Sequence, residues 1–134
     1  MGKKLKEPEY VLRLYPHLDE HTQQQGIVLA VETVEIFTNF RYDIILEDKR
    51  NGNEIDLKII GLHAPTMLMP GKGPALGKRE YFDLNGIYTV RINKMDKDLS
   101  EFSIQISPDR IFIKKHPNNS FIIAKIDGLQ VTKV

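Results

Sequence analysis

The chain has 134 residues, of which 41% are hydrophobic and 28% charged, so it is long enough for one domain with its own core. Its 19 basic and 18 acidic side chains give a net charge of +1, which excludes a strongly basic or strongly acidic character for the chain as a whole. The absence of cysteine excludes disulfides, thiol nucleophiles and cysteine-ligated metals, and it favours a reducing, cytoplasmic setting.

The first eight residues, MGKKLKEP, predict a flexible tail. They contain basic residues but no apolar run behind them, which a signal peptide requires. No segment approaches the roughly 20 apolar residues that a membrane-spanning helix needs. We therefore expect a tail at 1–8, a single all-β domain at 9–134, and no membrane partner.

Alternating apolar residues predict the first strands. In the segment YVLRLY, the side chains of Tyr10, Leu12 and Leu14 share one face. Further on, apolar residues occupy odd positions up to residue 31 and even positions from residue 34. This change of phase predicts a bulge or strand break near Glu32 and Thr33.

The next two runs, over residues 40–46 and 55–59, predict a β-hairpin. Asn51 and Gly52 lie between them, and this pair readily adopts the positive φ angles of a tight turn. The following segment, 61–80, contains three prolines and four glycines and is predicted to be a long irregular loop. Loops of this length in a small domain are usually functional or disordered.

The C-terminal half predicts further short strands. Alternating runs occur at 87–94 and 102–106, and strand-like segments follow at 110–115, 121–126 and 129–134, separated by turns. Together these runs predict an antiparallel β-sandwich of about 8–10 short strands, with a small β-barrel, OB-like or jelly-roll, as the alternative.

The segment LNGIYTV, residues 84–90, resembles the corner before the penultimate strand of immunoglobulin-like and fibronectin type III-like sandwiches. The resemblance implies that the Tyr88 hydroxyl bonds to upstream backbone, that Gly86 permits the corner, and that Val90 lies in the core. The chain lacks the cysteines and the tryptophan of antibody domains, so that subgroup is excluded.

The segment PGKGPALGK suggests anion binding but not a nucleotide-binding P-loop. Five residues separate Gly71 from Gly77, and Arg79 stands where a P-loop has its hydroxyl residue. Lys72, Lys78 and Arg79 remain candidates for holding an anionic ligand. The adjacent apolar run Met67, Leu68 and Met69 must either pack on the domain or contact a partner.

A third candidate surface is the segment RIFIKK. Alternation places Arg110, Phe112 and Lys114 on one side of a strand, and basic side chains beside an aromatic ring are typical of single-stranded nucleic-acid binding. An exposed edge strand explains the same pattern.

The histidines and carboxylates do not indicate catalysis. His17 and His21 are spaced for a shared metal on a helix, but no third ligand follows from the sequence, so no metal and no cofactor are expected. No nucleophile motif accompanies His63 or His116.

The sequence therefore predicts a non-catalytic binding or assembly module. Its partner is another protein or a second copy of the chain, contacted through an edge strand or through 67–69. A single-stranded nucleic-acid-binding barrel and an anionic-ligand protein using residues 61–80 are the alternatives.

Overall fold

The computed structural model describes residues 7–64, 71–95 and 97–133. These residues form ten strands and no helix, which confirms the all-β class. The strands follow from the alternation of apolar and polar residues, because every second side chain of a strand lies on the same face. The strands are β1 (Tyr10–Asp19), β2 (Gln24–Phe37), β3 (Asp43–Asn51), β4 (Glu54–His63), β5 (Gly73–Tyr81), β6 (Gly86–Lys94), β7 (Asp98–Ser107), β8 (Arg110–Lys115), β9 (Ile122–Ile126) and β10 (Gln130–Thr132).

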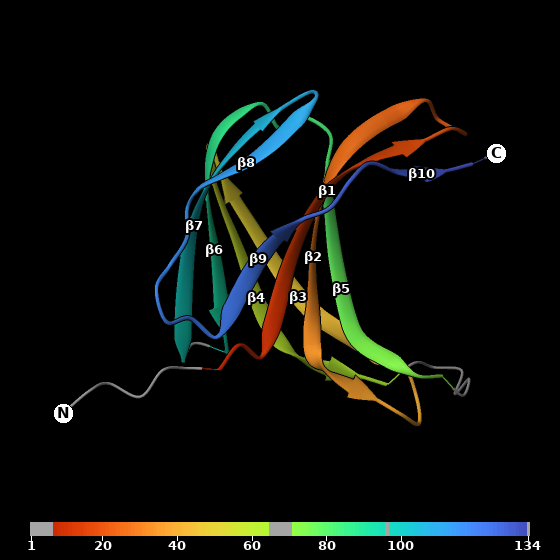
Figure 1. Ribbon diagram of the computed structural model, residues 1–134, viewed down its shortest axis with the longest axis vertical. Coiled ribbons are helices and arrows are strands. Elements are labelled where there is room, and N and C mark those ends of the chain that lie inside the picture. Colours follow the sequence, from red (N-terminus) through yellow and green to blue (C-terminus); the bar gives the residue numbers. More distant parts are fainter. Residues whose placement is uncertain (1–6, 65–70, 96, 134) are drawn as a thin grey trace.

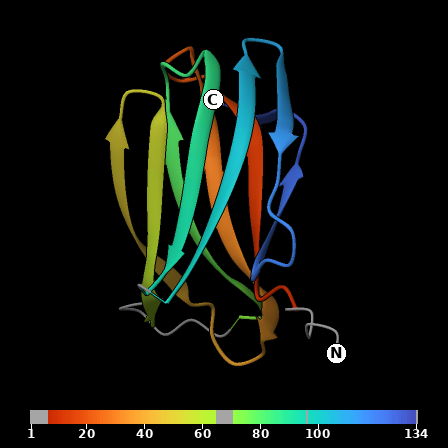
Figure 2. The same cartoon turned by 90° about the vertical axis from the view of Figure 1, so that its left-hand side faces the viewer.

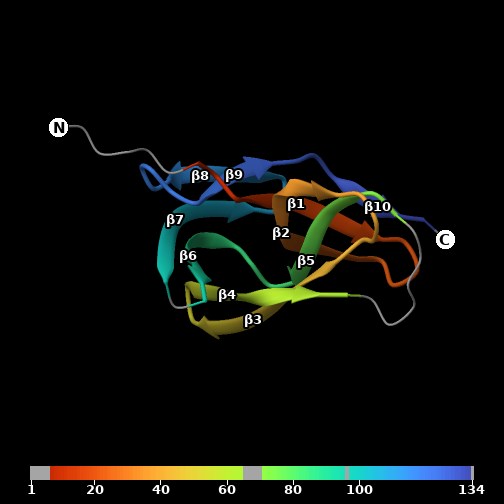
Figure 3. The ribbon, with the colours of Figure 1, turned by 90° about the horizontal axis from the view of Figure 1, so that it is seen from below.

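All ten strands belong to one hydrogen-bonded sheet in the order β10-β1-β2-β5-β3-β4-β6-β7-β8, and β9 pairs with β1 beside β10. The sheet curls into a nearly closed, flattened barrel (Figures 1 and 3). Its two halves join between β3 and β5, where a single register pair connects Asp43 with Leu76. The fold thus combines the two faces of the predicted sandwich with the curvature of the barrel alternative.

The pairings are mixed, and the expectation of a purely antiparallel sheet needs correction. Consecutive strands such as β3 and β4 form antiparallel hairpins, and Gly52 has the positive φ (60°) expected of their turn. By contrast, β1 with β9, β1 with β10, β3 with β5, and β4 with β6 are parallel. Parallel partners require a crossover connection, and turn residues between neighbouring strands carry no information about it.

Inward-facing side chains from both halves form one hydrophobic core. Because a strand alternates between its two faces, each contributes every second residue. The largest fully buried side chains are Phe102, Phe121, Leu12, Leu14, Leu29, Ile55, Leu57, Ile59, Ile92, Ile104, Ile106 and Ile122.

The change of phase in β2 produces the predicted bulge. Its register with β5 shifts between Glu32 and Ile36. At this point the Thr33 hydroxyl accepts a hydrogen bond from the Ala75 N–H at 2.9 Å and donates one to the Glu35 carbonyl at 2.8 Å. The buried side chain therefore satisfies backbone groups that the interrupted ladder leaves unpaired.

The prediction of a long irregular loop over residues 61–80 was wrong at 61–63 and 73–80, which belong to strands. Strand β4 continues to His63 and β5 begins at Gly73. The glycines and prolines do not break β5 because Pro74 lies at its start, opposite the bulge of β2, and Gly77 lies where two backbones approach closely. Residues 1–6 of the predicted tail and 65–70 of the predicted loop lie outside the described residues.

The corner before β6 has the geometry that the resemblance implied. The buried Tyr88 hydroxyl accepts a hydrogen bond from the Asn85 N–H at 3.0 Å and donates one to the Asn85 carbonyl at 3.4 Å. Gly86 has a φ of 124°, which other residues rarely adopt, and Val90 is fully buried. The tyrosine thus fixes the chain as it enters β6.

Replacing Tyr88 by phenylalanine is expected to lower the free energy of unfolding by about 1–2 kcal/mol, since the Asn85 N–H loses its acceptor in a half-buried site. Urea unfolding followed by circular dichroism measures this change. Asn85→Ala is the control, because only the backbone of Asn85 takes part in the corner. Equal effects of the two substitutions would contradict this role of the hydroxyl.

Candidate functional site: the seam between β8 and β9

The barrel is open between β8 and β9. The two strands run in opposite directions and are offset along the long axis of the molecule, with β8 in the upper part and β9 in the lower part of Figure 2. In the described sheet, β8 pairs only with β7, and β9 pairs only with β1. Both strands therefore have a backbone edge without a partner in the described sheet. We refer to β8, β9 and their connection, residues 116–121, as the seam.

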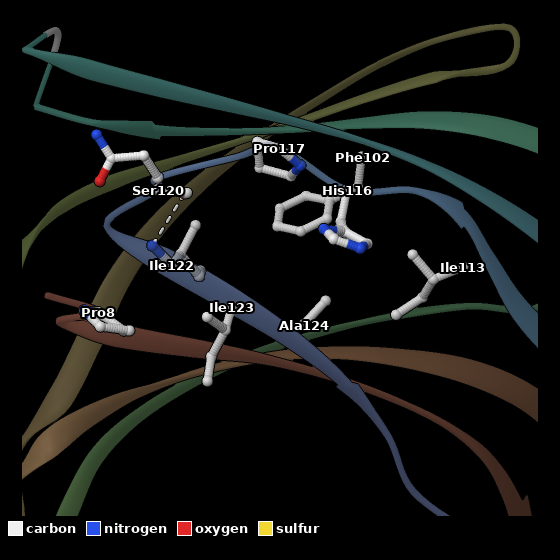
Figure 4. A pocket seen from close by; sticks show the side chains of 10 residues that line it. Pro8, Phe102, Ile113, His116, Pro117, Ser120, Ile122, Ile123 and Ala124 are labelled. Carbon is white, nitrogen blue, oxygen red and sulfur yellow. Dashed lines mark hydrogen bonds between the residues drawn. The ribbon is translucent and has the colours of Figure 1, made fainter. Parts of the chain in front are cut away.

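Two hollows lie in line along the seam. The first, of about 480 Å³, adjoins the 116–121 connection (Figure 4). The second, of about 380 Å³, lies at the other end of β8 and β9, where Ile111 and Ile126 line it. Both volumes fall in the usual range of ligand sites, about 300–1,000 Å³. The first hollow is lined by Pro8, Phe102, Ile113, His116, Pro117, Asn119, Ser120, Ile122, Ile123 and Ala124.

The connection that holds the seam is anchored to the core by Phe121. The Phe121 ring is 2% exposed and packs edge-on against Tyr10, with ring centroids 6.3 Å apart. Its carbonyl accepts hydrogen bonds from the backbone N–H groups of Glu9, at 2.7 Å, and Tyr10, at 3.2 Å. This residue fixes β9 beside β1 and thereby positions one wall of the seam.

Ser120 connects the two walls at the closed end. Its hydroxyl accepts a hydrogen bond from the Ile122 N–H at 3.1 Å (Figure 4) and also hydrogen-bonds to the hydroxyl of Ser100 on β7. The beginning of β9 is thus linked to the partner strand of β8. Because these groups are held by folded structure, the hollow exists before any ligand binds.

The edges of the seam are basic. Arg110, Lys114 and Lys115 on β8 and Lys125 on β9 are exposed. None of the residues that line the first hollow is acidic. The first hollow therefore combines an apolar lining with basic residues on the neighbouring strands, whereas Asp109 and Asp127 line the second hollow.

The predicted triplet Arg110, Phe112 and Lys114 lies on the exposed outer face of β8, as alternation implied. The Arg110 guanidinium lies 6.0 Å from the centroid of the Phe112 ring, and Phe112 is 50% exposed. None of these three residues lines the first hollow, whereas Arg110 also lines the second.

The predicted anion-binding residues do not converge. Lys72 precedes β5 and is exposed, while Lys78 and Arg79 are successive residues of β5 and point to opposite faces. Met67, Leu68 and Met69 lie outside the described residues.

Arg79 instead connects β5 to β3 where the halves of the sheet meet. Its Nη2 donates to the Leu46 carbonyl at 2.6 Å, and its Nε donates to Asp48 Oδ1 at 3.0 Å. Asp48 Oδ2 also accepts a hydrogen bond from the Tyr81 hydroxyl at 3.3 Å. Burial, followed by the negative charge of Asp48 and this hydrogen bond, raises the pKa of Tyr81 to about 12.

The histidines have separate environments. His17 Nδ1 lies 2.8 Å from Glu80 Oε2, whereas His21 donates its backbone N–H to Asp19 Oδ1 in the turn after β1. His116 lines the seam. Among the described residues, no cluster of three or more histidine, aspartate or glutamate side chains is placed to hold a metal.

Comparison with known proteins gives no assignment: the chain matches no protein family, no curated protein and no solved structure. The part of the chain that the structure describes contains no helix of the length and hydropathy needed to cross a bilayer.

Proposed function

We propose that this protein is a binding module that accepts an extended segment of a partner protein in the seam. The observation that carries the proposal is that β8 and β9 each have a strand edge without a partner in the described sheet, and that residues of both strands line one apolar hollow. The cysteine-free composition supports a cytoplasmic setting.

The chemistry of the edges favours a β-strand as the ligand. An inserted strand makes backbone hydrogen bonds to β8 on one side and to β9 on the other. Since β8 and β9 run in opposite directions, the inserted strand pairs antiparallel with one and parallel with the other (Figure 2). Its alternate side chains enter the hollow beside Ile113 and Ala124 and so bury apolar surface.

The charge of the borders favours an acidic ligand. Arg110, Lys114, Lys115 and Lys125 surround the seam, and an inserted strand directs its outward side chains toward them. In a segment that alternates apolar and acidic residues, the apolar side chains therefore enter the hollow and the acidic side chains meet the basic residues of β8 and β9. Pairing of β8 with β8 of a second copy brings like charges together, which disfavours self-association through this edge.

A titration of labelled protein, followed by its amide proton–nitrogen spectrum, tests the proposal. The probe is a synthetic peptide of alternating isoleucine and glutamate, and its control alternates isoleucine and lysine. We expect the glutamate peptide to shift the amides of 110–126 and the lysine peptide to leave them unchanged.

The variant Ile123→Glu places a negative charge at the mouth of the hollow and is expected to abolish these shifts. The matched control Ile87→Glu changes another exposed isoleucine, on β6, which does not line the hollow, and this variant is expected to bind normally. If the peptide shifts only amides outside residues 110–126, the seam is not the binding site.

Two further outcomes would indicate other functions. Amide shifts that depend on protein concentration alone would indicate self-association. Shifts of the Phe112 and Lys114 amides on adding a single-stranded oligonucleotide would favour nucleic-acid binding.

A further inference from the structure

A second arrangement lies on the outer face of β1, outside the seam. His17 is the centre of a chain of three side chains from three strands. Its Nδ1 lies 2.8 Å from Glu80 Oε2 on β5, and its Nε2 lies 2.7 Å from the hydroxyl oxygen of Thr132 on β10. Carboxylate, imidazole and hydroxyl are thus connected in the order found in hydrolases that use a hydroxyl nucleophile.

The hydrogen-bonding partners assign the proton of a neutral His17. The Glu80 carboxylate can only accept, so Nδ1 carries the hydrogen and donates it. Nε2 is then the acceptor, and the Thr132 hydroxyl donates to it. In this tautomer the imidazole is oriented to take the proton of Thr132, which is the requirement for a general base.

Gly26 makes the contact between His17 and Glu80 possible. It lies on β2, opposite His17 in the register of β1 and β2. A Cβ atom at this position would lie 2.7 Å from Glu80 Oε2 and 3.0 Å from the Phe82 ring. The missing side chain leaves the space through which the Glu80 carboxylate reaches the imidazole.

The three side chains line a hollow of about 500 Å³ on the outer face. Tyr15 and Val28 contribute apolar surface to it, and Lys78 contributes a positive charge. Thr132 is exposed, so a substrate in this hollow can reach its hydroxyl.

We propose that Thr132 and His17 are catalytic residues for acyl transfer from small esters, with Glu80 as the positioning residue. The Thr132 oxygen bonds to the carbonyl carbon while its proton passes to His17 Nε2. The ester C–O bond then breaks, and the leaving alcohol takes that proton from His17. Water hydrolyses the resulting threonine ester in the same way, which restores the hydroxyl and releases the acid.

The test uses p-nitrophenyl acetate with the full chain. We expect release of nitrophenol, and an acetyl group on Thr132 in peptides from acid-quenched protein. Thr132→Val and His17→Gln should each reduce the release rate by about 100-fold or more. Thr132→Ser should retain activity and carry the acetyl group on the new hydroxyl.

Glu80→Gln tests the positioning role, because it should lower kcat by about 100-fold or more and leave KM unchanged. The control Thr89→Val removes a hydroxyl from β6 on the other half of the sheet and should have no effect. Amide spectra of each variant verify folding. Absence of acetyl at position 132, or undiminished release in a folded Thr132→Val or His17→Gln variant, would overturn the proposal.

Discussion

Gly77→Ala is expected to lower the free energy of unfolding by about 3 kcal/mol, the cost of forcing an extra group into a well-packed site. A Cβ atom at this position would lie 2.6 Å from the backbone carbonyl oxygen of Ile44 and 3.1 Å from the Leu46 side chain. A carbonyl cannot rotate away as a side chain can, so β3 and β5 must separate. Their ladder has only the pair Asp43–Leu76 to maintain it.

Gly61→Ala is the matched control, since Gly61 is also within a strand but has open space where its Cβ would lie. We expect this substitution to change the free energy of unfolding by less than about 0.5 kcal/mol. Urea unfolding of both variants, followed by circular dichroism, gives the comparison. Equal stabilities would show that the backbones of β3 and β5 can move apart without cost.

Phe121→Ala is expected to lower the free energy of unfolding by about 3–5 kcal/mol, because it removes a fully buried aromatic ring from the core. The ring contacts Tyr10, and the Lys94 ammonium lies 5.7 Å from its centroid. Its loss leaves a cavity beneath the connection that positions β9. We therefore expect weaker binding of the isoleucine–glutamate peptide as well as lower stability.

Phe112→Ala is the control for the loss of stability, because it removes an aromatic ring that is exposed instead of buried. Phe112 is 50% exposed on β8, and its removal should leave the free energy of unfolding nearly unchanged. Urea unfolding and the peptide titration together distinguish the variants. If Phe121→Ala were as stable as Phe112→Ala, the connection would not depend on this anchor.

Features that depend on neighbouring residues were predictable from the sequence. The turn at Asn51 and Gly52 determines the β3–β4 hairpin, and the change of phase near Thr33 marks the bulge of β2. The corner at Tyr88 is equally local, since the hydroxyl bonds to a residue three positions away. In each case the chemistry that fixes the geometry lies within a few residues.

Features that depend on distant segments were not predictable in this way. Both strands of the seam were predicted, but their failure to pair depends on the curvature of the whole sheet. His17 and Thr132 are 115 residues apart, and only the parallel pairing of β1 with β10 brings them together. Gly77 resembled a residue of an anion-binding loop, whereas its role is to let β3 approach β5.

The parallel pairing of β1 with β9 and β10 also determines how the fold responds to tension. Five residue pairs connect β1 to β9 and three connect it to β10. Pulling on the start of β1 and the end of β10 moves parallel neighbours in opposite directions along their length. The hydrogen bonds of these pairs are therefore loaded together in shear and do not open one after another. This loading raises the barrier to mechanical unfolding, so the chain unfolds more slowly under an applied force.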